Sequence, residues 1–161
     1  MEHILEGSQI ILNHLSHEVI DEYLEKFSAT IQTLLHVGDV QSERQYLMAR
    51  CAQQSFFYTI THREHGTVIG AIEIRNPGHI SQLYCWINEE FWGCGYFRQA
   101  LRLAVREYAM QTGEQIISAC IDTDNTRSLA ACQSVGFKKK GTRNGPHGMQ
   151  MVLELHINDI L

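Results

Sequence analysis

The feature that most constrains the fold of this chain is a turn at residues 93–95, where Gly93 and Gly95 flank Cys94. The turn follows the apolar segment 80–87 and precedes a segment whose apolar residues recur at helical spacing. A glycine turn before a helix leaves several backbone N–H groups unpaired, with the positive end of the helix dipole behind them. The turn therefore has two interpretations: a phosphate-binding loop, or a tight turn whose glycines only supply unusual dihedral angles.

The helix after this turn is the clearest element that the sequence predicts, and Gly113 is its stop signal. A helix with one apolar stripe must pack that stripe on a sheet. The stripe consists of Phe97, Ala100, Leu101, Ala104, Val105 and Tyr108, and the arginines on the other side are Arg98, Arg102 and Arg106. Of these arginines, Arg98 is close enough to the turn to be a candidate phosphate contact.

The rest of the pattern predicts strands on both sides of this helix. Three strands joined by short turns, within residues 55–87, indicate an antiparallel meander. A strand at 116–121 completes a strand, helix, strand crossover, which makes the sheet mixed. We also expect a strand at 9–15, a helix after Ser16, an ambiguous segment at 28–40, a helix with a capping box at 42–45, a helix at 126–135 and two last strands around 144–146.

These elements predict an α+β fold with a central mixed, mostly antiparallel sheet of six or seven strands, flanked by about four helices. The 161 residues, 44% of them hydrophobic, suffice for one core, so we expect a single domain over residues 1–161. The formal net charge of −5 argues against direct nucleic-acid binding, and no apolar run is long enough to span a membrane.

Cysteine and histidine usage limits the possible sites. Five cysteines without a C-x-x-C pair predict neither a disulfide framework nor a zinc knuckle, and they favour a reducing cytoplasm. The nine histidines include His62 and His65 on a turn, but no H-x-H or H-E-x-x-H pair. No metal site is therefore expected.

Three motifs follow one another in the second half of the chain. They are Tyr84-Cys85-Trp86-Ile87 at a strand end, Trp92-Gly93-Cys94-Gly95-Tyr96 at the turn, and Asn125-Thr126-Arg127-Ser128 followed by Gly136-Phe137. With this order and spacing, the chain resembles the GNAT acyltransferases over nearly its whole length. Within that family it is most similar to the Rim-type branch, which acetylates the N-termini of ribosomal proteins.

The resemblance implies acetyl-CoA as a co-substrate. The N–H groups of residues 93–98 would hold its pyrophosphate, and the backbone of Trp86 and Ile87 would pair with its pantetheine arm as an added strand. Asn125 would offer a donor and an acceptor to that arm, or would only cap its helix. The implied cofactor-binding residues are Trp86, Ile87, Trp92, Gly93, Cys94, Gly95, Tyr96, Phe97, Arg98, Asn125 and Ser128.

The resemblance also implies that a neutral amine attacks the thioester directly, in a ternary complex. The oxyanion donor would be a backbone N–H of the strand at 85–87. Many GNAT members have a tyrosine seven residues after the asparagine, and this chain has Cys132 there. Ser128 is therefore the candidate donor on the thiolate side, with Cys132 or water as alternatives.

The general base is less well defined. Gln82 stands where related enzymes often carry a glutamate, and glutamine cannot accept a proton as a base. Glu73 on the preceding strand is the candidate base, with His79 as an alternative. A water chain is a third possibility, because a protein α-amino group has a pKa of about 7.7–8.0 and is partly neutral at cytosolic pH.

The expected function is transfer of an acetyl group from acetyl-CoA to a primary amine, with a protein N-terminal α-amine as the leading acceptor. The alternatives are a small-amine acceptor, either a polyamine or an aminoglycoside, and a catalytically weak acyl-CoA-binding regulatory module. The basic run formed by residues 138–140 and Arg143 is typical of a solvated strand edge, although it could contact an acidic acceptor or part of the ribosome. We expect a cytoplasmic monomer or homodimer.

Overall fold

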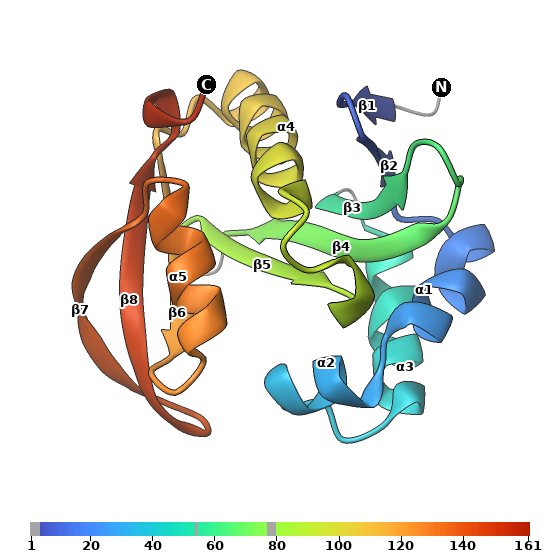
Figure 1. Cartoon of the computed structure of the whole chain (residues 1–161), viewed down its shortest axis with the longest axis horizontal. Helices are drawn as coiled ribbons and strands as arrows, with labels where there is room; N and C mark the ends of the chain where they lie inside the picture. Colours follow the sequence, from blue (N-terminus) through green and yellow to red (C-terminus); the bar gives the residue numbers. More distant parts are fainter. Residues whose placement is uncertain (1–3, 54, 77–79) are drawn as a thin grey trace. The chain divides into compact units, whose positions relative to one another are not determined.

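The computed structural model describes residues 4–53, 55–76 and 80–161 (Figure 1). Within them it has eight strands and five α-helices. The strands are β1 (Ile4–Glu6), β2 (Ile10–His14), β3 (Phe56–His62), β4 (Val68–Arg75), β5 (Gln82–Ile87), β6 (Ile116–Asp122), β7 (Lys138–Gly145) and β8 (Gly148–His156). The helices are α1 (Ile20–Lys26), α2 (Ala29–Leu34), α3 (Val40–Cys51), α4 (Tyr96–Thr112) and α5 (Thr126–Ser134), with short 3-10 helices η1 (His17–Val19), η3 (Glu89–Phe91) and η4 (Ile157–Asp159).

The strands hydrogen-bond in the order β1-β2-β3-β4-β5-β6-β8-β7. The pair β5–β6 is parallel, whereas β1–β2, β2–β3, β6–β8 and β7–β8 are antiparallel. The predicted mixed, mostly antiparallel sheet is thus confirmed. The strand that the sequence did not predict is β1, whose three residues are too few to display the alternation that identifies a strand.

The helical region before β3 contains one correction. The capping box at 42–45 predicted a helix start at Ser42, but α3 begins at Val40. Its N-cap is Asp39, whose carboxylate accepts a hydrogen bond from Ser42 N at 2.7 Å. That bond lowers the pKa of Asp39. The ambiguous segment contains α2, whose N-cap Ser28 accepts from Ile31 N.

The chain divides into two compact units, and the border falls inside β4, β5 and α4. The N-terminal unit contains residues 1–73 and 85–104, and the C-terminal unit contains residues 74–84 and 105–161.

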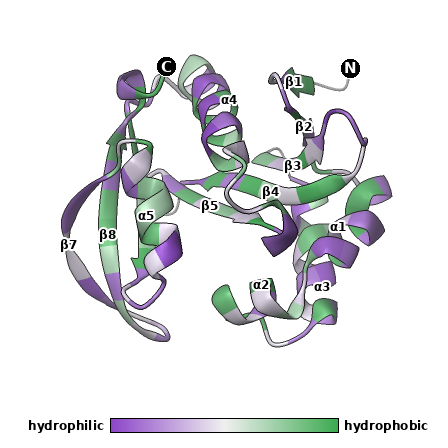
Figure 2. Ribbon diagram, viewed as in Figure 1, coloured by the Kyte–Doolittle hydropathy of each residue, from purple (hydrophilic) through white to green (hydrophobic). Residues whose placement is uncertain are grey.

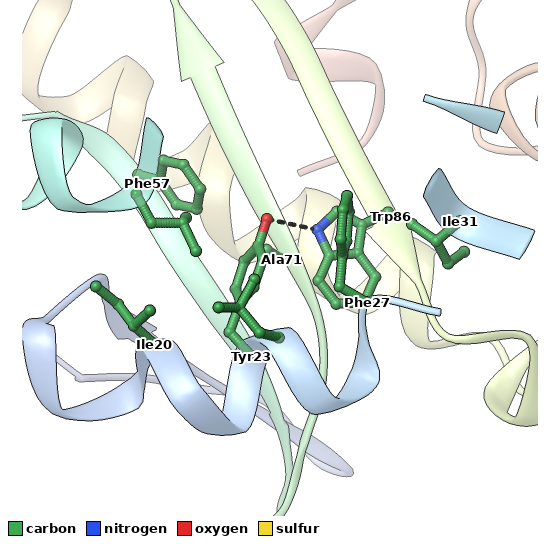
Figure 3. Close-up of a cluster of buried hydrophobic side chains, with 9 residues drawn as sticks. Ile20, Tyr23, Phe27, Ile31, Phe57, Ala71 and Trp86 are labelled. Atoms are coloured by element: carbon green, nitrogen blue, oxygen red, sulfur yellow. Dashed lines mark hydrogen bonds between the residues drawn. The ribbon is translucent and has the colours of Figure 1, made fainter. Parts of the chain in front are cut away.

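The core of the N-terminal unit has β4 at its centre. Every residue from Val68 to Glu73 is buried, so this strand is covered on both faces, and Figure 2 shows hydrophobic colouring along much of it. On one face, side chains from α1, α2, α3 and the strands form a single cluster (Figure 3). Its members are Ile20, Tyr23, Leu24, Phe27, Ile31, Leu47, Phe57, Ala71 and Trp86.

The C-terminal unit is built on the antiparallel strands β6, β8 and β7, with α5 following β6 in the chain. Gln82 in β5 pairs with Ser118 in β6, the parallel contact expected of a crossover. A buried hydrogen bond of 2.6 Å joins the hydroxyls of Ser81 and Tyr108. The basic residues 138–140 are exposed on β7, which is the last strand of the sheet, as expected of a solvated strand edge.

Helix α4 has the predicted apolar stripe, with Ala100, Leu101, Ala104, Val105 and Tyr108 all buried. At its start, however, the buried aromatic residue is Tyr96, whereas Phe97 is half-buried. No helix in the described ranges is both long enough and apolar enough to span a membrane.

Candidate functional site

The glycine turn lies in the N-terminal unit, directly before the first turn of α4. Gly93 and Gly95 adopt φ values of 75° and 80°, a left-handed region that favours glycine. Gln99 N donates to Gly95 O at 3.4 Å, so Gly95 is the N-cap of α4. The N–H groups of the first helical turn have no partners within the helix. A Cβ on either glycine would meet no atom within 4 Å, so the turn is open to a ligand.

Hydrogen bonds hold the loop between β5 and this turn. Trp92 Nε1 donates to Ile87 O at 2.7 Å, which closes the loop on the end of β5. The buried Asn88 donates from Nδ2 to Lys26 O at 2.9 Å and accepts from Glu90 N at 3.0 Å. The glycine turn is therefore attached to a fixed loop, which is also bonded to the end of α1.

The other expected residues of the turn differ in exposure. Cys94 is an exposed free thiol, with its Sγ 3.7 Å from Trp92 O. Arg98 is exposed. The Tyr96 hydroxyl, in contrast, lies 3.0 Å from His62 Nε2 at the end of β3, and the two rings meet edge to face. Sequence reasoning missed this contact, because His62 is far from the turn in the chain and its neighbours gave no signal.

Trp86, near the end of β5, is buried among aromatic rings. Its indole packs edge to face on Tyr23 and Phe27, with ring centroids 4.9 and 5.3 Å apart. Trp86 Nε1 donates to the Tyr23 hydroxyl at 3.0 Å, as Figure 3 shows, and that hydroxyl donates to Glu43 Oε1 at 2.7 Å. Burial, with the Glu43 carboxylate, raises the pKa of Tyr23 well above its usual range. The Trp86 side chain therefore supports β5 from the α1 and α3 side.

The backbone of β5 approaches β4 closely at the same place. A Cβ on Gly70 would lie 3.0 Å from Ile87 Cα and only 2.2 Å from Trp86 O, a distance that real Cβ atoms essentially never show. Only glycine fits there. A glycine inside a strand pattern signals such an approach, so Gly70 was detectable from the sequence.

Glu73, the candidate base, is only 3% exposed. Its Oε2 accepts from the Tyr46 hydroxyl at 2.7 Å, and its Oε1 forms an ion pair with Arg50 Nη2 at 2.5 Å. Both partners lie on α3. Glu73 is therefore a buried carboxylate that joins β4 to α3.

The other two positions considered for the base, Gln82, which replaces the expected glutamate, and His79, can be placed only in part. Gln82, in the C-terminal unit, accepts from the Tyr84 hydroxyl at 2.7 Å, and the Arg75 guanidinium lies 3.8 Å from the centroid of the Tyr84 ring. The amide oxygen of Gln82 is thus oriented by a neighbour in its own strand. His79 lies outside the described residues.

Asn125 and Ser128 lie in the C-terminal unit, at the start of α5. Asn125 Oδ1 accepts from Ser128 N at 3.2 Å, so the predicted helix cap is confirmed. Ser128 is half-buried. Cys132 is buried, and burial raises the pKa of its thiol to about 12. It therefore stays a neutral thiol, a weak hydrogen-bond donor, as expected of a cysteine that only packs.

Replacement of Asn125 separates its two expected roles. Asp keeps the side-chain oxygen that caps α5 but lacks the amide donor, whereas Ala loses both. We expect Asn125→Ala to reduce the free energy of unfolding by about 1 kcal/mol, and Asn125→Asp to preserve it. If the amide also holds the pantetheine arm, Asn125→Asp will weaken acetyl-CoA binding without lowering stability. Thermal unfolding measures the change in stability, and calorimetric titration measures the affinity for acetyl-CoA. If Asn125→Asp and the wild type bind acetyl-CoA equally well, Asn125 serves only as the cap of α5.

The structure thus places residues 86–98 and Glu73 in the N-terminal unit, and Asn125 and Ser128 in the C-terminal unit. Among the described residues, no group of three His, Cys, Asp or Glu side chains is arranged to hold a metal ion.

Comparisons with known proteins identify the family and the fold of this chain. The acetyltransferase (GNAT) domain model matches residues 9–138, whereas a search of curated protein sequences found no match. Three similar solved structures share the fold. A GNAT-family acetyltransferase from Bacillus anthracis has a TM-score of 0.83 at 12% identity, over 97% of this chain and 99% of that one.

A ribosomal-protein-S5-alanine acetyltransferase from Vibrio fischeri has a TM-score of 0.75 at 15% identity, over 99% of both chains. The microcin C7 self-immunity acetyltransferase, solved with acetyl-CoA and AMP, has a TM-score of 0.75 at 15% identity, over 93% of both chains. At these identities the structural likeness establishes the fold alone. The family match spans most of the sequence, and it includes the glycine turn, Asn125 and Ser128. The chain therefore belongs to the GNAT acetyltransferase family and is an acetyl-CoA-dependent N-acetyltransferase.

Proposed function

We propose that this enzyme acetylates protein N-terminal α-amines in the cytoplasm, as the Rim-type branch does. The observation that carries the proposal is that neither Gln82 nor Glu73 offers a carboxylate that an acceptor could reach directly. Gln82 cannot accept a proton, and both oxygens of the buried Glu73 already contact Tyr46 or Arg50. An α-amine, with a pKa of about 7.7–8.0, is partly neutral near pH 7, whereas a lysine-like amine has a pKa of about 10.4. The site therefore fits an acceptor that needs little help to lose its proton.

In this proposal, the first turn of α4 holds the pyrophosphate of acetyl-CoA, and the end of β5 pairs with the pantetheine arm. The Ile87 carbonyl already accepts from Trp92 Nε1, but a carbonyl oxygen has a second lone pair for the arm. Acetyl-CoA supplies the activated acetyl group. A backbone N–H of residues 85–87 would stabilise the oxyanion that forms on attack, and the Ser128 hydroxyl would donate a hydrogen bond to the departing thiolate.

We further propose that Glu73 receives the amine proton by way of Tyr46. Glu73 is too buried for an acceptor to reach directly, whereas Tyr46 is half-buried and donates to it at 2.7 Å. The Tyr46 oxygen would take the proton from the amine while its own proton passes to Glu73 Oε2. No charge then remains on the phenol.

Tyr46→Phe tests this relay. We expect kcat at pH 7 to fall about tenfold, less than the usual 10²–10⁴-fold contribution of a general base, because part of the amine is already neutral. The loss should shrink toward pH 9, where the amine needs no base. The pH profile of kcat for both proteins is the measurement, and a loss of the same size at every pH would assign Tyr46 a structural role instead.

The acceptor is tested with a panel of amines. Purified protein is mixed with acetyl-CoA and, separately, with N-terminal peptides whose lysines are blocked, with polyamines and with aminoglycosides, and thiol release is followed. Preferential turnover of the peptides, confirmed by mass spectrometry of the N-terminus, is the expected result. Turnover of polyamines or aminoglycosides alone would replace the peptide proposal with a small-amine acceptor. If the protein binds acetyl-CoA but releases no thiol with any of these amines, the result would indicate the acyl-CoA-binding regulatory module.

A further inference from the structure

The glycine turn needs an anchor, because glycine is the residue with the greatest backbone freedom. Gly93 and Gly95 have no side chains that could hold the turn, and a Cβ added at either position would meet no atom within 4 Å. The first residue after them with a buried side chain is Tyr96, which is 9% exposed and opens α4. Whatever fixes Tyr96 therefore also fixes the first-turn N–H groups that follow the glycines.

The contacts of His62 supply that anchor. His62 Nδ1 accepts a hydrogen bond from His65 N at 3.3 Å, which assigns the ring proton to Nε2 in the neutral tautomer. Nε2–H can then donate to the Tyr96 hydroxyl, 3.0 Å away. The His65 ring stacks on His62 at 4.5 Å, with the two ring planes 24° apart. The turn between β3 and β4 thus fixes both the tautomer and the orientation of the imidazole.

We infer that His62 is a positioning residue for acetyl-CoA: through Tyr96 it holds the first turn of α4 in the conformation that binds the phosphates. The inference rests on the proposed placement of the pyrophosphate at this turn. His62 itself touches neither the acetyl group nor the amine in this account. Its loss therefore acts on cofactor affinity rather than on the chemical step, because a turn that is not held in place must be ordered on binding.

His62→Leu removes the donor, Tyr96→Phe removes the acceptor, and His62→Gln keeps a donor at the position of Nε2. Glu64→Ala is the matched control, since it truncates an exposed side chain of the same turn but keeps the stacked His65 ring and the His65 backbone N–H. We expect His62→Leu and Tyr96→Phe each to weaken acetyl-CoA binding about three- to tenfold, the range of one lost hydrogen bond. His62→Gln should recover most of the affinity, and Glu64→Ala should change it less than about twofold.

The readouts are the Kd of acetyl-CoA by calorimetry, the split between KM and kcat, and the melting temperature. The KM for acetyl-CoA should rise at nearly constant kcat, and the double variant His62→Leu/Tyr96→Phe should bind no more weakly than the worse single variant. Additive losses, or an unchanged Kd in folded Tyr96→Phe, would overturn the inference. If His62→Leu does not fold, Tyr96→Phe and His62→Gln still decide the question. Failure of the wild type to bind acetyl-CoA would instead overturn the proposed placement of the cofactor.

Discussion

Gly95→Glu is expected to abolish detectable acetyl-CoA binding. The new carboxylate would lie at the N-cap of α4, where the side chain projects into space that holds no protein atom within 4 Å. Like charges brought together in a binding site cost several kcal/mol, which corresponds to a loss of affinity of about a hundredfold or more. The residue would also have to adopt the φ of 80° that Gly95 has, at a cost of about 1–2 kcal/mol.

Gly113→Glu is the matched control for this variant. Gly113 follows the other end of the same helix, has a φ of 75° and also has no atom within 4 Å of its Cβ position. The backbone strain and the added charge are therefore the same, but the phosphates are not expected there. Calorimetric titration should show wild-type affinity for Gly113→Glu and none for Gly95→Glu. Equal affinities in the two variants would mean that the pyrophosphate binds elsewhere.

Gly70→Ala is expected to have the largest effect on stability. All three atoms nearest the added Cβ are backbone atoms of Trp86 and Ile87, so no side chain can rotate away to make room. The strands must move apart, which we expect to cost about 3 kcal/mol, at the upper end for overpacking, or roughly 6–12 °C in melting temperature. Because the displaced backbone is also the expected oxyanion donor, kcat should fall in the fraction that remains folded.

Gly141→Ala shows what the same change does where there is room. Gly141 also lies inside a strand, β7, and its Cβ would meet no atom within 4 Å. We expect its melting temperature to stay within about 3 °C of the wild type, since alanine restricts the unfolded chain more than glycine does. If Gly70→Ala and Gly141→Ala have the same melting temperature, β5 can move away from β4 without loss of stability. The close approach of β5 would then not require glycine at position 70.

Elements whose signal is local could be predicted from the sequence. The apolar stripe of α4, its stop at Gly113 and the cap at Asn125 each depend on residues within one or two helical turns, and the structure contains all three. The mixed sheet was predictable for a similar reason, because short turns and a crossover helix limit how strands can pair. The placement of residues 93–98 at the start of a helix follows from the same local pattern.

Contacts between distant segments could not be predicted in this way. Nothing near His62 shows that it reaches Tyr96, and nothing near Glu73 shows that α3 covers it. The capping box at Ser42 had an equally good competitor in Asp39, and in the structure it is the Asp39 carboxylate that caps α3 by accepting from Ser42 N. A pattern in one segment records which residues are buried there but does not identify the segment that buries them.

The hydrogen-bonded indoles have a consequence for how the protein can be observed. The chain has two tryptophans, Trp86 and Trp92, and both lie in the N-terminal unit. Intrinsic tryptophan fluorescence therefore reports on the unfolding of the N-terminal unit and carries no probe within residues 105–161. Far-UV circular dichroism, in contrast, reports on the strands and helices of both units. If the two signals melt at one temperature, the protein unfolds as a single cooperative system; a second transition seen only by circular dichroism would belong to the C-terminal unit.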